Sequence, residues 1–94
     1  MTTHVVMFRF TASHDAAEAA TRLKSMKGRI PGLIDVRAGV DHNRGPNAYD
    51  VVLITKHEDE DALKSYSSHP VHIEVAEWLA DRITDRAVVD TDDL

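Results

Sequence analysis

Two segments of the chain, residues 4–10 (HVVMFRF) and residues 48–56 (AYDVVLITK), have the β-branched and aromatic composition of β-strands. Successive side chains of a strand point to opposite faces of its sheet, so a sheet with one face in water alternates apolar and polar residues. These segments do not alternate in this way, because each has apolar residues on both faces. The apolar residues opposite the first apolar row are Val5, Met7, Val52 and Ile54. Both faces of the predicted sheet therefore need to be covered.

The rest of the chain supplies helices and two further strands. A helical pattern occupies residues 13–30, and a second helical region is formed by residues 58–66 and 69–83. Strand-like segments at residues 33–40 and 85–90 complete the order βαββαβ. This order predicts an α+β fold of the ferredoxin-like type, with helices on one face of an antiparallel sheet. Since helices then cover one face only, we expect a second copy of the chain to cover the other face in a homodimer.

Composition limits the classes of function. The length of 94 residues predicts one domain over residues 1–94, with an acidic tail at about residues 90–94 (DTDDL). The net charge of −5 and the absence of a basic stripe make nucleic acid an unexpected partner. No segment is long and apolar enough to cross a membrane or to act as a signal peptide, so we expect no membrane association and a cytoplasmic protein. The chain has no cysteine, which excludes disulfides and thiolate metal sites.

The segment SYSSHPVHIEVAEWL (residues 65–79) combines Tyr66 and His72 with the start of a helix at Pro70. One helical face contains His72, Val75, Ala76, Leu79 and Ile83. This face should lie against the sheet, with His72 at the mouth of an apolar cleft. An imidazole can take a proton at neutral pH, and a phenol can donate a hydrogen bond to a developing oxyanion. The alternative is that the Tyr66 hydroxyl binds His72 and only fixes the bend.

Two further histidines are candidates for this region. His69 precedes Pro70, so it should be extended and should accept a hydrogen bond from a free N–H at the start of the helix. His69 and His72 form the pattern H-x-x-H, but no third ligand is evident, and no metal site is predicted. His4 shares a strand face with Val6, and it either approaches the cleft or lies at the surface. The histidines expected to be exposed are His14, His42 and His57.

The chain resembles the stress-responsive A/B barrel (Dabb) family over nearly its whole length. The resemblance rests on HVVMFRF, IPGLIDVRAGV, YDVVLIT and ALKSYSSHPVHIEV, in that order. Its most specific part is Tyr66 with His69, Pro70 and His72. The resemblance implies a homodimeric α+β barrel built from two ferredoxin-like protomers. It also implies cofactor-free aldol chemistry for some members, because a plant polyketide cyclase of the family has its catalytic tyrosine and histidine at the positions of Tyr66 and His72.

The resemblance also places histidines of the cyclase at His4 and His69. The chain departs from the family at His57, where a phenylalanine is usual, and at Ala19, Ala20 and Leu23, where the cyclase has pocket aromatics, so we expect a wider pocket near that helix. The predicted substrate-binding residues are His4, Val6, Phe8, Leu23, Leu53, His69 and Ile83. Three functions remain open: a cofactor-free enzyme acting on a small hydrophobic carbonyl compound, a binding module for such a molecule, and a non-enzymatic, stress-related dimer.

Overall fold

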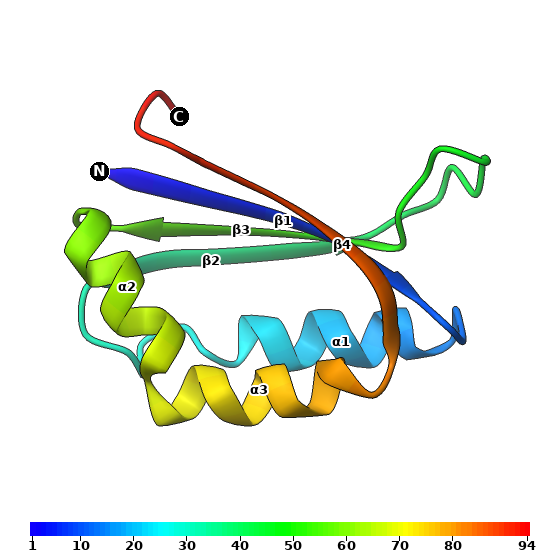
Figure 1. Cartoon of the computed structure of the whole chain (residues 1–94), viewed down its shortest axis with the longest axis horizontal. Helices are drawn as coiled ribbons and strands as arrows, with labels where there is room; N and C mark the ends of the chain where they lie inside the picture. The colour runs from blue at the N-terminus through cyan, green and yellow to red at the C-terminus, as the bar shows by residue number, and fades with distance from the viewer.

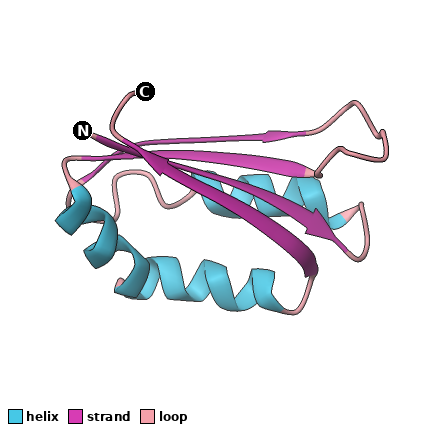
Figure 2. Ribbon diagram, turned by 45° about the horizontal axis from the view of Figure 1, so that its top comes forward, coloured by secondary structure: helices cyan, strands magenta, loops and turns pink.

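The computed structural model describes residues 1–94 and forms one four-stranded sheet with three helices on one of its faces (Figure 1; Figure 2). The elements are β1 (Thr2–Phe10), α1 (Asp15–Lys24), β2 (Leu33–Val40), β3 (Val51–His57), α2 (Glu60–Ser68), α3 (Pro70–Ala80) and β4 (Ile83–Thr91). The helix lengths are 10, 9 and 11 residues, and no helix is long and apolar enough to cross a membrane.

The strands lie in the order β2-β3-β1-β4, and every neighbouring pair is antiparallel. The two central strands, β1 and β3, are those whose sequences have apolar residues on both faces. In the register of the sheet, Val6 of β1 is opposite Leu53 of β3 and Val88 of β4. The ferredoxin-like prediction is confirmed by this order and by the position of the helices.

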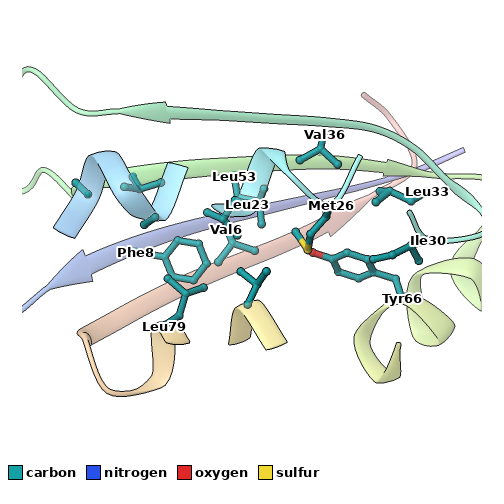
Figure 3. Packing of buried hydrophobic residues seen from close by; sticks show 14 of the residues in the cluster. Val6, Phe8, Leu23, Met26, Ile30, Leu33, Val36, Leu53, Tyr66 and Leu79 are labelled. Atoms are coloured by element: carbon teal, nitrogen blue, oxygen red, sulfur yellow. The ribbon is translucent and has the colours of Figure 1, made fainter. Parts of the chain in front are cut away.

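The core lies between the sheet and the helices (Figure 3). Val6 and Phe8 of β1 and Leu53 of β3 contribute the sheet side, and all three are buried. Leu23 of α1 and Leu79 of α3 close the core from the helix side. Full burial of a side chain of this size contributes about 1.5–3 kcal/mol, so this layer supplies the main driving force for folding.

The other face of the sheet is left open by the helices. Met7, Val52 and Val89 are 39%, 37% and 61% exposed, although all three are large and apolar. Val5 and Ile54 lie opposite each other on the same face and are half-buried. An apolar face of this kind on a small protein is typical of a surface that contacts another protein.

One predicted boundary at the end of the chain is wrong. We expected Ile83 to end the last helix, but α3 ends at Ala80 and Ile83 is the first residue of β4. The last strand was predicted to end at Asp90, and it ends one residue later, at Thr91. Asp90 lies in this strand, opposite His4 of β1.

Candidate functional site

The bend between α2 and α3 positions Tyr66 and His72. Asp59 caps α2 by accepting a hydrogen bond from the Ala62 N–H at 2.8 Å. His69 is extended (φ −70°, ψ 139°), and its Nδ1 accepts from the Val71 N–H at 3.1 Å, which confirms its predicted role at the start of the next helix. The chain turns sharply at this residue because Pro70 disfavours a helical conformation before it. The turn brings the ring centroids of Tyr66 and His72 to 4.5 Å.

Tyr66 lies deep in the molecule and is only 1% exposed. Its ring extends from α2 into the core, with the hydroxyl oxygen at the inner end (Figure 3). Three imidazoles surround the ring, with centroid distances of 4.5 Å to His72, 4.7 Å to His57 and 6.1 Å to His4. Burial raises the pKa of Tyr66 to about 12, against a smaller opposing effect of the Arg86 charge. The phenol therefore stays protonated at neutral pH and can donate a hydrogen bond.

His72 is held with one ring nitrogen available. Its Nδ1 lies 3.0 Å from the backbone carbonyl oxygen of Ser67. Because a carbonyl only accepts, Nδ1 carries the proton in this bond, and Nε2 of the neutral ring has a free lone pair. Burial lowers the pKa of His72, and the bond to Ser67 opposes this only in part. His72 is therefore neutral at pH 7 and can act as a base. In the alternative considered from the sequence, the Tyr66 hydroxyl binds His72 and fixes the bend. In the structure, His72 is instead hydrogen-bonded to the Ser67 carbonyl.

His4 lies on the same side of the sheet as the helices, on the face that contains Val6. Its Nδ1 donates to Asp90 Oδ1 at 2.5 Å, across the β1–β4 pair. This bond fixes the orientation of the ring and does not use its other nitrogen, Nε2. The structure thus places His4 at the cleft and not at the surface end of a strand.

Two adjoining cavities meet at these residues. The outer cavity has a volume of about 850 Å³ and a largely polar lining, whereas the inner cavity has about 140 Å³ and a mainly apolar lining. The residues that line both cavities are His4, Tyr66, His72 and Arg86. The polar groups of the site therefore stand at the boundary between an open polar space and a small apolar space.

The inner cavity contains most of the predicted binding residues. It is lined by His4, Val6, Phe8, Leu23, Leu53 and Ile83, together with Tyr66 and His72. His69 is the one predicted binding residue that lines neither cavity, and its ring caps α3 instead. Of the helix positions expected to widen the pocket, Leu23 lines the inner cavity, whereas Ala19 and Ala20 are buried and do not.

His57 was expected to be exposed, but its exposed fraction is 0%. Its Nε2 is hydrogen-bonded to the Thr55 hydroxyl at 2.8 Å, and its Nδ1 is buried without a partner. Burial lowers the pKa of His57 to about 4. The sequence does contain a signal for this position, since His57 follows Val51, Leu53 and Thr55 at every second residue of a strand. His14 and His42 are exposed as expected.

Arg86 was not singled out from the sequence, although it lines both cavities. It is opposite Phe8 in the β1–β4 pair, and Phe8 points toward the helices. Arg86 therefore shares the face of Asp90, four residues further along β4. As for metals, no group of three His, Asp or Glu side chains is arranged to hold an ion.

Comparisons with known proteins place the chain among small ferredoxin-like proteins. The family model of the stress-responsive A/B barrel domain (Dabb) matches residues 2–93. A dimeric ferredoxin-like protein of unknown function from Thermobifida fusca is 27% identical, with 96% of this chain and 88% of that chain covered and a TM-score of 0.83. No curated protein sequence matches the chain.

Two more distant structures share the fold. A Dabb family protein from Mesorhizobium loti is 20% identical, with 99% of this chain and 96% of that chain covered and a TM-score of 0.80. The hydroxynitrile lyase of Passiflora edulis is 12% identical, with 96% and 90% covered and a TM-score of 0.78.

Proposed function

Because the chain belongs to the stress-responsive A/B barrel domain family, we propose that its cleft binds a small, hydrophobic, carbonyl-bearing molecule and transforms it by cofactor-free acid/base chemistry. The observation that carries the proposal is the pairing of Tyr66 and His72 at the boundary of the two cavities, with ring centroids 4.5 Å apart. Concave apolar sites with a few convergent polar groups are typical of small-molecule binding.

The proposed reaction begins with removal of a proton from the carbon next to the carbonyl. The Nε2 lone pair of His72 takes this proton, the C–H bond breaks, and its electron pair moves onto the carbonyl oxygen. Tyr66 stabilises the resulting enolate by donating a hydrogen bond to that oxygen, which is most effective where water is excluded. The enolate carbon then attacks a second carbonyl of the same molecule, and the alkoxide so formed takes the proton back from the protonated His72. The net result is an aldol ring closure that consumes no co-reactant.

Exchange of the α-proton for deuterium tests the first step without knowledge of the natural substrate. We expect the protein in D₂O to accelerate this exchange, followed by NMR, for at least one small aryl or alkyl ketone or oxo acid. Tyr66→Phe and His72→Gln should each lower the rate by about 10²-fold or more, since a positioned base contributes about 10²–10⁴-fold. His14→Gln, which removes an exposed histidine that lines neither cavity, is the matched control.

The outcomes separate the candidate functions. Exchange that depends on both Tyr66 and His72 supports the enzyme. Binding of the ketones without accelerated exchange supports a binding module, a function consistent with the small apolar cavity beside Tyr66. Neither binding nor exchange would leave the non-enzymatic dimer as the remaining function.

We also propose that the protein is a homodimer in which the open faces of two sheets pack together as an α+β barrel. The exposed apolar side chains of Met7, Val52 and Val89 support this arrangement, as does the dimeric state of the Thermobifida fusca relative. Coverage of a few such side chains stabilises association by about 1.5–3 kcal/mol each, before the entropic cost of association is subtracted.

A further inference from the structure

We propose that the ligand of the cleft carries one carboxylate, which binds the guanidinium group of Arg86 while the apolar part of the ligand fills the inner cavity. This inference rests on the proposed binding function of the cleft and names the chemical class of its ligand. The class is that of small monocarboxylic acids with an apolar body, of which oxo acids also carry the carbonyl that the proposed chemistry requires.

The first observation is that Arg86 is a cation without a partner. It forms no ion pair with any carboxylate of the chain, and no hydrogen bond from its side chain is present. Asp90, the carboxylate on the same face of β4, is occupied by His4. Asp90 therefore binds His4 and forms no ion pair with Arg86, so the guanidinium keeps all of its donors free.

Three other arginines have side-chain partners, and three more, Arg29, Arg37 and Arg44, have none but line neither cavity. Arg9 pairs with Asp85 and stacks on Tyr49, and Arg22 pairs with Glu18. Arg82 donates to the Trp78 carbonyl at 2.8 Å and lies over its ring. Arg86 thus combines a free guanidinium with a position at the site.

The second observation is where this free cation stands. Arg86 lines both the apolar inner cavity and the polar outer cavity, together with Tyr66 and His72. The planar guanidinium presents paired N–H donors that match the two oxygens of a carboxylate. Arg86 is itself exposed to solvent, so the proposed pair depends on this two-pronged geometry and on the position of the guanidinium beside the apolar cavity, and not on burial of the charge.

The size and charge of the surroundings narrow the ligand further. The inner cavity of about 140 Å³ is close to the size of an engineered apolar cavity, about 150 Å³, that accommodates benzene. The outer cavity is lined by four carboxylates and, besides Arg86, one further cation, and the chain has a net charge of −5; these residues are Glu60, Asp90, Asp92, Asp93 and Lys64. These charges repel a ligand with several negative groups, such as a phosphate ester, more strongly than one with a single carboxylate. A benzene-sized body with one carboxylate satisfies both conditions.

Phenylacetate and its neutral analogue phenylacetamide test the inference by titration calorimetry, with acetate, benzoate and phenylpropionate extending the series. The test variants are Arg86→Gln and Arg86→Lys. The control is Arg29→Gln, which removes the same charge from an exposed residue that lines neither cavity. For the unchanged protein we expect the acid to bind about tenfold or more tightly than the amide, the ratio expected for a hydrogen bond to a charged group. In Arg86→Gln this ratio should fall to about one through loss of acid binding, and Arg86→Lys should retain part of it. Arg29→Gln should leave the ratio unchanged.

Three results would overturn the inference: equal binding of acid and amide by the unchanged protein, an unchanged ratio in Arg86→Gln, or no binding of any carboxylate of the series. Failure of the proposed chemistry is a separate result. Tyr66→Phe should keep the preference for the acid while losing deuterium exchange. A preference for acids that depends on Arg86, without exchange in any variant, would support the ligand class and contradict the enzyme.

Discussion

Replacement of His57 and its partner Thr55 by Phe and Val is expected to remove a loss of stability that the protein otherwise suffers in acid. The pKa of His57 is lowered by burial from 6.5 to about 4. Below pH 6.5 the unfolded chain binds a proton at this residue, while the folded protein excludes it until about pH 4. Since the unfolded state binds more protons in this window, the free energy of unfolding falls as the pH falls. A difference of about 2.5 pKa units at about 1.36 kcal/mol each gives a total loss of about 3 kcal/mol, complete near pH 4.

The double variant Thr55→Val/His57→Phe is the appropriate perturbation. Both side chains are fully buried and hydrogen-bonded to each other, so removing only the imidazole would leave the Thr55 hydroxyl unpaired, at a cost of about 1–3 kcal/mol. The variant also removes the unpaired Nδ1 of His57. The stability of the variant relative to the unchanged protein should therefore increase by about 3 kcal/mol between pH 7 and pH 4.

Urea denaturation at several pH values measures this difference. Trp78 is the only tryptophan and lies between Arg22 and Arg82, so its fluorescence reports the packing of α1 against α3. Protein concentration is kept constant because a dimer is stabilised by mass action. His14→Gln is the control and should follow the unchanged protein at every pH. The lowered pKa values of Asp35 and His72 also reduce stability in acid, but they act in both proteins and cancel in the difference. A difference that is constant from pH 7 to pH 4 would refute the reasoning, since it would mean that His57 does not resist protonation in the folded state.

Three further predictions concern the backbone, the helix cap and the sheet face. Gly32→Ala should destabilise the protein by about 2 kcal/mol or more, because φ is +82° and the new Cβ would lie 2.8 Å from the Ala62 Cβ. Gly28→Ala, with φ +79° and open space, should cost only about 1–2 kcal/mol in the same urea assay; equal losses would contradict the predicted clash. His69→Ala should cost about 1 kcal/mol by removing the cap of α3 and leave phenylacetate affinity unchanged in titration calorimetry, whereas weakened binding would restore His69 to the site. Val52→Lys should yield a monomer by light scattering at concentrations where the unchanged protein is a dimer, and a dimeric variant would argue against the sheet-to-sheet interface.

The fold could be predicted from the sequence largely because apolar residues recur at a different spacing in strands than in helices. Residues 33–40 were predicted as a strand and form β2 with the same limits. The boundary between α3 and β4 could not be predicted in the same way. Ile83 continues the helical face of Leu79 at a spacing of four, and it also begins the strand that follows. The two residues before it, Asp81 and Arg82, include neither Gly nor Pro to mark the end of the helix.

The candidate site could be predicted only where local sequence determines it. Tyr66 and His72 come together because Pro70 forces a bend between two helices, and that bend can be inferred from neighbouring residues. His57 and Arg86 reach the site through strand pairing, which depends on the register of residues far apart in the sequence. The alternation with Val51, Leu53 and Thr55 indicates which face His57 occupies, but only the pairing of the strands shows which side chains lie beside His57 and Arg86.

His57 and Arg86, which the sequence analysis did not assign to the site, differ in what they affect: His57 affects stability, whereas Arg86 is proposed to bind the ligand. His57 packs 4.7 Å from the Tyr66 ring but lines neither cavity, so its unpaired Nδ1 weakens the protein without any contact with a ligand. Arg86 lines both cavities, and its guanidinium has no carboxylate partner within the chain. Unsatisfied polar groups in an otherwise consistent fold tend to occur at functional sites. If His57 only supports Tyr66, the double variant should gain acid stability and keep its preference for phenylacetate over phenylacetamide. Loss of that preference would show that the position of Tyr66, which His57 helps to set, also determines how the ligand reaches Arg86.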